Sequence, residues 1–256
     1  MKTSLSRKDR SKPLVSVVIR TKNEEKYLRM VLDAYARQTF KDFEVLIVDD
    51  HSVDGTCGIA ESRGCRVAEI PEGKFSHPFS CNFGAGKSIG RYIVFTNGHS
   101  IPVSNTFLDD GLRNFEDDNV AGVFALPIAH ADGTIADKLI YNIAGYTVGA
   151  IRYRIGGLAH LLIGPENGIL GTTNAMIRKD LWTKYPFDEN INGGWGGEDA
   201  DWAWHFVSMG YRIVHDPKFR VRHSHHLRVR DLFWQFRNWR RMVSSEQIPE
   251  RQRKNF

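Results

Sequence analysis

The chain has 256 residues, 41% of them hydrophobic, and a formal net charge of +5 with histidine counted as neutral. This length and composition allow one substantial hydrophobic core and exclude a wholly disordered chain. The three cysteines lack CxxC and CxxH spacing, which argues against a disulfide framework or a zinc ribbon and favours a reducing, cytoplasmic compartment. No stretch approaches the roughly 20 apolar residues of a membrane span. The modest positive charge, concentrated in 2–12 and 218–254, does not indicate nucleic-acid binding.

The first half of the chain alternates apolar, β-branched runs with helical patterns. Strands are predicted over 14–19, 45–48, 66–70 and 92–95. Helices are predicted after the first three strands, the first with Asn23 and Glu24 as capping candidates, the second through about residue 63 and the third over 82–89. This alternation predicts an α/β fold: a mostly parallel, doubly wound sheet flanked by helices, with its ligand at the carboxyl ends of the strands.

The second half is less regular. The alternation weakens beyond residue 120, and the Gly-rich stretch 144–171 is expected to form loops and short elements facing an acceptor. From residue 190 the pattern sharpens, because the run 193–197, GGWGG, leads into a helix that carries Trp202 and Phe206 on one side and ends at Gly210.

Polar side chains follow the first two predicted strands. Thr21, Asn23 and Glu24 come after the first strand, and Asp49 and Asp50 end the second. A carboxylate at this shared edge can accept hydrogen bonds from a ribose hydroxyl or a base N–H. The alternative is that these residues only cap turns, but agreement between two strand ends favours a nucleotide site.

Histidines at two distant places are candidate metal ligands. Asn97-Gly98-His99 follows the strand 92–95, and His223 and His225 lie after a short predicted strand, 219–222, whose alternation sends both to one side and His226 to the other. Imidazole suits Mn²⁺, Co²⁺ or Zn²⁺ better than Mg²⁺, so a divalent cation, Mn²⁺ before Mg²⁺, is expected. Ordinary hydrogen-bonded histidines are an equally weighted alternative.

Two adjacent acids open the helix behind the Gly-rich run. Side chains of Glu198 and Asp199 diverge by ~100° on a helix, so one can remove a proton while the other orients an acceptor. The alternative is favourable charge at a helix N-terminus. Trp195, with Gly194 beside it, is the kind of exposed indole on which a sugar ring stacks, and this favours the catalytic interpretation.

The run 84–88, GAGKS, is not a phosphate-binding loop of an NTPase. That loop requires GxxxxGK[ST], and Cys81 occupies the position of its first glycine. Lys87 is a candidate for neutralising a diphosphate, with a solvated helix lysine as the alternative. Asn82, in the same predicted helix, and Asn97 are further candidates for contact with a nucleotide-sugar.

Several motifs together resemble the family 2 glycosyltransferases of the GT-A fold. VSVVIRTKNEEKYL and QTFKDFEVLIVDDHSVDGT look like the nucleotide-binding half, and KFSHPFSCNFGAG with YIVFTNGHSIP is similar to bacterial rhamnosyltransferase-like members. GTTNAMIRKDLW, GGWGGEDADWAWH and FRVRHSHH resemble the acceptor and metal region of the β-1,4-galactosyltransferase type. Together they cover most of residues 14–226 in the expected order.

The resemblance implies roles for particular residues. Asp50 would contact the nucleoside, Asp199 would be the general base, Glu198 and Trp195 would hold the acceptor, and His223 would complete a metal site. Where the family usually has Asp-x-Asp, this chain has Asn97-Gly98-His99, so its metal site carries less negative charge.

The expected protein is an inverting glycosyltransferase with three segments: a polar leader, 1–13; a GT-A domain, 14–227, with a nucleotide-sugar half, 14–100, and an acceptor half, 101–227; and a basic amphipathic helix, 228–256. The expected partners are a UDP- or dTDP-sugar donor and a saccharide or lipid-linked acceptor used in polysaccharide synthesis. The last segment either packs on the domain or binds the inner face of a membrane. A non-catalytic nucleotide- or carbohydrate-binding protein is the main alternative, and a nucleotidyltransferase a weaker one.

Overall fold

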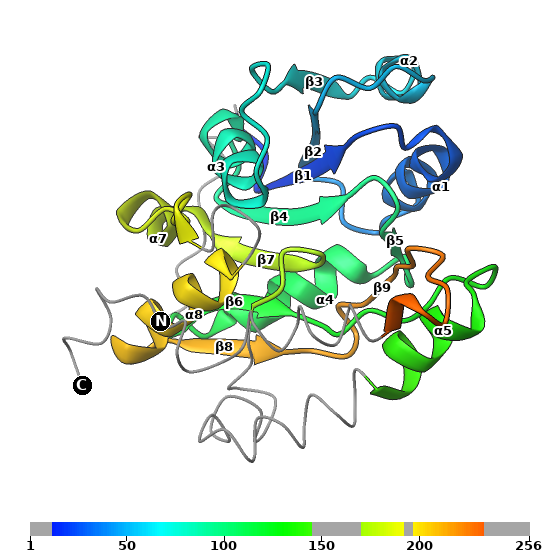
Figure 1. Cartoon of the computed structure of the whole chain (residues 1–256). Coiled ribbons are helices and arrows are strands. Elements are labelled where there is room, and N and C mark those ends of the chain that lie inside the picture. The colour runs from blue at the N-terminus through cyan, green and yellow to red at the C-terminus, as the bar shows by residue number, and fades with distance from the viewer. Residues whose placement is uncertain (1–11, 145–169, 192–196, 233–256) are drawn as a thin grey trace.

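The computed structural model describes residues 12–144, 170–191 and 197–232. One sheet of seven strands, in the order β3-β2-β1-β4-β7-β6-β8, runs through the molecule (Figure 1). Its strands are β1 (Val15–Thr21), β2 (Phe43–Asp49), β3 (Arg66–Glu69), β4 (Tyr92–Asn97), β6 (Val120–Phe124), β7 (Ala175–Arg178) and β8 (Arg212–His215). All pair in parallel except β7, which is antiparallel to β4 and β6. The mixed, mostly parallel sheet predicted from the sequence is confirmed.

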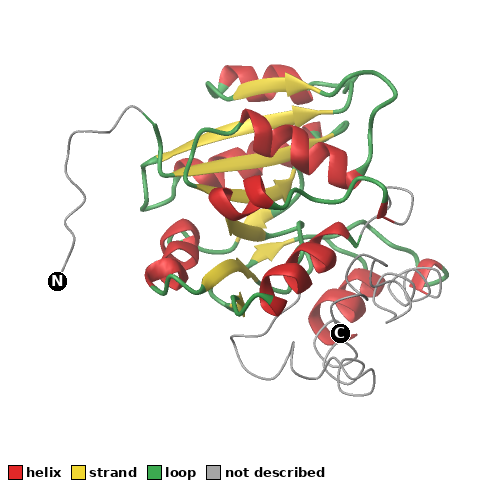
Figure 2. Ribbon diagram, turned by 90° about the vertical axis from the view of Figure 1, so that its left-hand side faces the viewer, coloured by secondary structure: helices red, strands yellow, loops and turns green. Residues whose placement is uncertain are grey.

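Helices lie on both faces of this sheet (Figure 2). They are α1 (Glu25–Ala36), α2 (Thr56–Ser62), α3 (His77–Lys87), α4 (Phe107–Arg113), α5 (Ile135–Lys138), α7 (Lys179–Lys184) and α8 (Glu198–Ser208), with a 3₁₀ turn at Asn114–Glu116 and a π-helical stretch at Leu139–Ala144. The helix predicted over 82–89 thus begins earlier, at His77, because Ser76 caps it by accepting from the N–H of Phe79 and Pro78 fits its first turn.

Alternation along β1 divides the core into two layers. Val17 and Ile19 pack into a cluster with the inner faces of α1 and α4, and Val18 packs into a second cluster with α3 and α8. Trp202 of α8 is fully buried in the second cluster. Because both faces are covered, the strands are apolar on both sides, as expected for a buried parallel sheet.

The start of α1 differs from the prediction. Neither Asn23 nor Glu24 caps the helix with its side chain. The first free N–H groups are instead satisfied by residues between β2 and the start of α2: Thr56 Oγ1, at the first residue of α2, accepts from the N–H of Glu24 at 2.7 Å, and Asp54 accepts from the N–H of Glu25 at 3.1 Å. The Glu24 side chain is therefore free to contact another part of the chain.

A two-stranded antiparallel sheet joins β5 (Ile101–Pro102) to β9 (Val221–Arg222). The predicted strand 219–222 is thus shorter, beginning at Val221. The pairing has a functional consequence, because it places the segment after β9 next to the segment between β4 and β5.

The C-terminal prediction lies mostly outside the described residues. Within the described part, Leu227 and Leu232 pack against a small cluster formed by Ala129, Ile140 and Tyr141. Among the described helices, none combines the length and apolar character needed to cross a membrane.

Candidate active site

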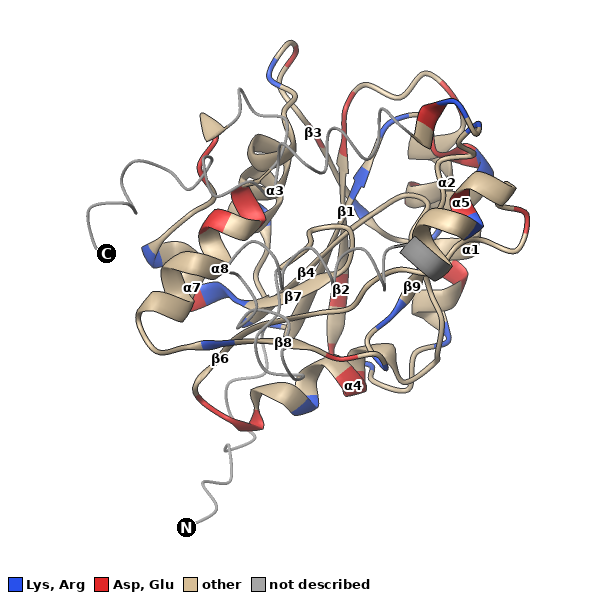
Figure 3. Ribbon diagram, turned by 60° about the horizontal axis from the view of Figure 1, so that its bottom comes forward, with Lys and Arg blue, Asp and Glu red and all other residues tan. Residues whose placement is uncertain are grey.

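The candidate site lies at the carboxyl-terminal edge of the parallel strands. β1, β2 and β4 end there at Thr21, Asp49 and Asn97, and the antiparallel β7 begins there at Ala175. Loops from both halves of the chain therefore meet at one edge, as the sequence predicted. Lys and Arg are interspersed with Asp and Glu over many elements of the fold (Figure 3).

The residues after β1 and β2 form a tight hydrogen-bonded turn. Asp49, only 1% exposed, accepts from Thr21 Oγ1 at 2.7 Å and from both the N–H and the Oγ of Ser52. Asn23, in the left-handed region with φ of 54°, accepts from the N–H of Val53. These contacts tie the two strand ends together, so Thr21, Asn23 and Asp49 shape the edge of the sheet.

Of the two acids at the end of β2, Asp49 and Asp50, only Asp50 has a solvent-exposed side chain as its partner. It is 7% exposed, and its Oδ2 lies 2.7 Å from the ammonium of Lys22, whose side chain is 59% exposed. A solvated lysine is held only weakly by a surface ion pair and can rotate away. Asp50 can therefore exchange this contact for a hydroxyl or an N–H of a ligand.

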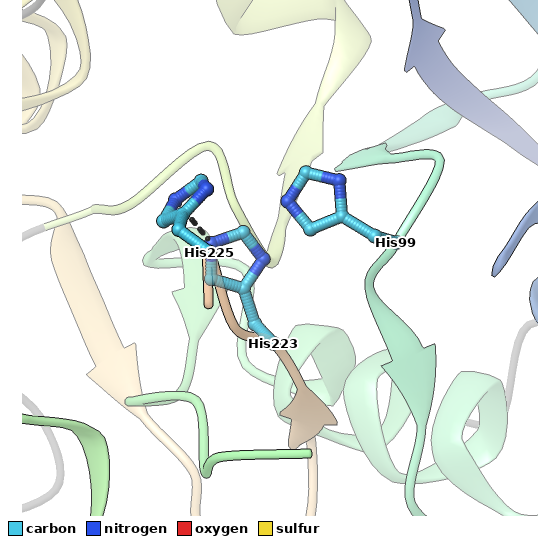
Figure 4. Close-up of side chains that lie close together, drawn as sticks. All are labelled: His99, His223 and His225. Carbon is cyan, nitrogen blue, oxygen red and sulfur yellow. Dashed lines mark hydrogen bonds between the residues drawn. The ribbon is translucent and has the colours of Figure 1, made fainter. Parts of the chain in front are cut away.

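Three of the predicted histidines converge. One ring nitrogen from each of His99, His223 and His225 lies within 4.8 Å of the others (Figure 4). His223 Nε2 and His225 Nε2 are 3.0 Å apart, and the His99 and His223 rings stack at 4.6 Å between centroids. β9 carries the later two histidines to His99, which follows β4.

The surroundings of these histidines suit a bound cation. His99 Nε2 is buried and has no hydrogen-bond partner, which is costly unless a ligand occupies it. Burial first, and then the imidazoles of His99 and His225, hold the pKa of His223 well below its usual range, so its ring is neutral. Neutral imidazole is the form that binds metals.

The acid pair lies at the N-terminus of α8. Glu198 is 2% exposed and its Oε2 has no partner, whereas the half-buried Asp199 accepts from the N–H of Thr172 at 3.1 Å and from that of Ala200 at 2.8 Å. Burial raises the pKa of both carboxyl groups, and for Glu198 the charge of Asp199 adds to this rise. Two adjacent carboxyls with raised pKa values are suited to proton transfer near neutral pH.

Arg20 is a residue of this edge that sequence reasoning missed. It donates from Nη2 to the carbonyl oxygen of Thr172 at 2.9 Å. Its charge opposes the rise that burial causes in the pKa of Asp199 and of Glu198, and it adds to the lowering of the pKa of His223. The field of Arg20 therefore reaches both the acid pair and the histidine cluster. The available signal was a lone charged residue in a buried strand, where an unpaired charge is costly.

Two predicted residues have other environments. Lys87 ends α3 at the amino-terminal edge of the sheet, where its carbonyl oxygen accepts from Arg66 at the start of β3, so the structure does not bring it to the site. Asn82 links α3 to the segment before α8: it donates to the carbonyl oxygen of Phe187 and accepts from Trp182 Nε1. Its amide is thus engaged in holding the fold.

Trp195 and Gly194 lie outside the described residues.

The mostly parallel sheet of seven strands with helices on both faces is the GT-A fold of glycosyltransferases. The chain belongs to Glycosyl transferase family 2, whose sequence model matches residues 16–185.

Two of the curated relatives are O-antigen chain rhamnosyltransferases. The O-antigen chain rhamnosyltransferase WbaN of Salmonella anatum is 24% identical, over 79% of this chain and 63% of its own length. The O-antigen chain rhamnosyltransferase RfbN of Salmonella typhimurium is 21% identical, over 87% of this chain and 70% of its own. The chain thus spans somewhat under two thirds of WbaN.

Solved structures share the fold. The mannosyltransferase PcManGT of Pyrobaculum calidifontis, in complex with GDP-Man and Mn²⁺, has a TM-score of 0.64 at 19% identity and covers 91% of this chain and 63% of its own. Glucosyl-3-phosphoglycerate synthase of Mycobacterium tuberculosis, in complex with Mn²⁺, UDP and glucosyl-3-phosphoglycerate, has a TM-score of 0.67 at 17% identity and covers 93% and 81%.

Proposed function

We propose that this chain is an inverting glycosyltransferase that moves a sugar from a nucleoside-diphosphate sugar to a hydroxyl group of an acceptor. The observation that carries the proposal is the position of Arg20. It donates to the carbonyl oxygen of Thr172, whose N–H donates to Asp199, and it lies beside Asn97, two residues before His99, in the sheet. A positive charge close to both the proton acceptor and the metal ligands stabilises the negative charge of a departing diphosphate.

The nucleoside is assigned to the ends of β1 and β2. Asp50 is the carboxylate offered to the ribose or base, because its partner Lys22 is solvent-exposed. Thr21, Asn23 and Asp49 contribute by fixing the shape of this edge through their mutual hydrogen bonds. The diphosphate then extends toward the loop after β4, which carries His99.

The acid pair supplies the acid–base chemistry. Asp199, half-buried and held by two backbone N–H groups, accepts the acceptor hydroxyl proton as that oxygen forms a bond to the anomeric carbon. The bond from the anomeric carbon to the phosphate oxygen breaks on the opposite face, and the nucleoside diphosphate leaves with the electron pair, so the configuration inverts. Glu198 holds a sugar hydroxyl with its unpartnered Oε2.

The described residues fit a divalent cation. His99, His223 and His225 would hold it, and the orphaned, buried His99 Nε2 is the observation that supports this fit. When bound, such an ion stabilises negative charge on the diphosphate. Mn²⁺ in the complexes of PcManGT and glucosyl-3-phosphoglycerate synthase supports a divalent ion on this fold.

The expected donor is a UDP- or dTDP-sugar, and UDP in the complex of glucosyl-3-phosphoglycerate synthase supports the first of these. The O-antigen chain rhamnosyltransferases among the relatives support a saccharide acceptor, which we expect to be free or lipid-linked. A lipid-linked acceptor lies at a membrane, and the basic residues of 228–256 suit contact with an anionic leaflet at its inner face. Flotation of the full chain with anionic vesicles tests that contact. Equal flotation of a variant that ends at residue 227 contradicts it.

Donor binding and product configuration test the function itself. Calorimetry with UDP, dTDP and GDP, each with Mn²⁺ and with chelator, is expected to give metal-dependent binding of one nucleotide. Proton NMR of the product formed from the matching sugar donor is expected to show the anomeric configuration opposite to that of the donor. Retained configuration refutes the inverting mechanism, and binding without any transfer to a panel of acceptors favours a non-catalytic binding protein.

A further inference from the structure

The Glu24 side chain contacts the back of the first candidate metal ligand. Glu24 Oε1 lies 2.6 Å from His99 Nδ1, and both side chains are 16% exposed. The approach is close: a Cβ added to Gly98 would stand 2.6 Å from Glu24 Cβ and 2.5 Å from its Cγ. Glycine at position 98 is thus what allows Glu24 to reach His99.

This contact indicates which nitrogen of a neutral His99 ring carries the proton. A carboxylate oxygen accepts, so the proton of a neutral His99 is placed on Nδ1, and Nε2 carries the lone pair. That Nε2 is the buried atom with no hydrogen-bond partner. In Figure 4 it faces the other two imidazoles.

A chain of hydrogen bonds fixes the second ligand in the same way. The N–H of His99 donates to Asn97 Oδ1 at 3.3 Å, which assigns the orientation of that amide. Ser100 Oγ donates its proton to the same Asn97 Oδ1 at 2.8 Å. Ser100 Oγ must then accept from His223 Nδ1, 3.1 Å away, which leaves the lone pair of His223 on Nε2.

The third ligand is held through its backbone. The buried Asp137 accepts from the N–H of His225 and from that of Leu227, both at 3.3 Å. The His225 ring itself is exposed, and its Nε2 lies 3.0 Å from His223 Nε2. Two ligands are therefore fixed in ring orientation and the third can adjust to an ion.

We propose that Glu24 and the Asn97–Ser100 pair are positioning residues that present Nε2 of His99 and of His223 to a three-imidazole centre, which selects borderline ions such as Co²⁺ and Zn²⁺ over Mg²⁺. This inference rests on the metal site of the proposed function and deepens it. Asn97 then has a role other than ligation. Its amide oxygen accepts a hydrogen bond from the Ser100 hydroxyl and so sets the tautomer of His223.

The ion preference follows from the donor set. The cluster offers three imidazole nitrogens as ligands. The nearby carboxylate of Glu24 contacts Nδ1 of His99, on the other side of the ring from Nε2. Mg²⁺ requires oxygen ligands, whereas Zn²⁺ and Co²⁺ accept imidazole nitrogen readily. Partners that orient metal-bound histidines typically change metal affinity by about 10-fold to 100-fold when they are removed.

Binding of Co²⁺ to the full chain, without donor or acceptor, tests the inference. Affinity is measured by calorimetry and coordination by visible absorption. Glu24→Ala and Asn97→Ala are expected to weaken Co²⁺ binding by about 10-fold to 100-fold. Glu24→Gln keeps an accepting oxygen and is expected to restore most of the affinity. Asn97→Asp likewise keeps an acceptor for Ser100 and is expected to bind at least as tightly as the wild type.

The controls separate positioning from general damage. Glu61→Ala and Ser62→Ala alter an exposed glutamate and a serine whose Oγ donates to a backbone carbonyl, both on α2, and are expected to leave Co²⁺ affinity unchanged. In Asn97→Ala the freed Ser100 hydroxyl can donate to His223 Nδ1 and shift its proton to Nε2. Adding Ser100→Ala removes that donor, so the double variant is expected to bind no more weakly than Asn97→Ala.

Three results would overturn the inference: no Co²⁺ binding by the wild type, wild-type affinity in both Glu24→Ala and Asn97→Ala, or displacement of Co²⁺ by an equal concentration of Mg²⁺. Thermal unfolding of each variant shows whether it has lost its fold. If an alanine variant has, the Co²⁺ affinities of Glu24→Gln and Asn97→Asp decide whether the accepting oxygen at each position is what supports binding. Because ion binding is measured without sugar transfer, a protein that binds Co²⁺ as expected but transfers nothing contradicts the proposed function and leaves this inference standing.

Discussion

Arg20 of β1 and Thr172, which precedes β7, are joined by a hydrogen bond from Arg20 Nη2 to the carbonyl oxygen of Thr172, 2.9 Å long. The N–H of Thr172 in turn donates to Asp199 Oδ2. Thr172 thus connects the guanidinium of Arg20 on β1 to the proposed base on α8. The charge of Arg20 lowers the pKa of Asp199 against the larger, opposite effect of burial.

Replacing Arg20 by Met is therefore expected to reduce turnover and shift its pH dependence. Loss of a preorganised group that stabilises developing charge costs about 10²-fold to 10³-fold in kcat. Asp199 must be ionised to act as a base, so activity falls as pH drops through its pKa. Without Arg20 that pKa rises further, and the acidic limb of the kcat/KM profile is expected to move to higher pH.

Arg29→Met on the exposed face of α1 is the matched control for this experiment. It is expected to leave both the rate and the acidic limb in place. An Arg20→Met enzyme with wild-type kcat and an unshifted acidic limb would show that Arg20 only holds the loop at Thr172.

Asp199→Asn is expected to separate donor binding from chemistry. The amide retains similar size, and its one oxygen can still accept from Thr172 or from Ala200, so the nucleotide affinity is expected to stay within about twofold, or ~0.4 kcal/mol. Loss of the general base is expected to lower kcat by about 10²-fold to 10⁴-fold. Stopped assays of transfer, alongside calorimetry with the nucleotide, measure the two quantities. An equal loss in the transfer rate and in the nucleotide affinity would assign Asp199 to donor binding instead.

The fold was largely predictable, because its signals are local. β-branched runs at Val17 and Val45 and the helical spacing from Tyr27 to Tyr35 each lie within one element. The antiparallel direction of β7 was not predictable. The four residues of β7 do not encode its direction, which depends on the long connection that precedes it in the sequence.

The site was predictable only in part. The convergence of His99 with His223 and His225 was anticipated from their positions after strands, and the structure brings the three together. The contact of Glu24 with His99 depends on the turn at Asn23 and on the absence of a side chain at Gly98, and no periodicity encodes such geometry. The side-chain contacts of Asn82 and the place of Lys87 likewise depend on tertiary packing.

Lys87→Ala is expected to have no effect on donor binding. Lys87 is exposed, lies over the Phe83 ring and ends α3 at the edge of the sheet opposite the site. Substitutions of this kind usually change stability by less than ~0.5 kcal/mol, and affinity is expected to change by less than about twofold. A larger loss of affinity, measured with the preferred nucleotide, would restore Lys87 as a contact for the diphosphate.

Asn82→Ala is expected to destabilise the fold without changing the nucleotide affinity. The substitution removes the donor to the Phe187 carbonyl oxygen and the acceptor for Trp182 Nε1. Leaving such groups unpaired costs about 1–3 kcal/mol. The unfolding temperature is expected to fall by roughly 2–4 °C for each of these kcal/mol. Thermal unfolding with and without nucleotide measures both effects, and wild-type stability combined with weakened nucleotide binding would place Asn82 at the donor.

Glu198→Gln is expected to stabilise the protein more at pH 8 than at pH 5. Burial raises the pKa of Glu198 above the unfolded value of about 4.3. The fold therefore favours the protonated form, and stability is lost progressively as pH rises from the unfolded pKa through the raised one. Glutamine is never ionised, so it removes this loss, which is on the order of 1–3 kcal/mol for a buried group left unpaired. Urea unfolding at both pH values measures the difference, with Glu61→Gln on the exposed face of α2 as the control. An equal effect at the two pH values would mean that Glu198 stays protonated, or stays ionised, throughout this range.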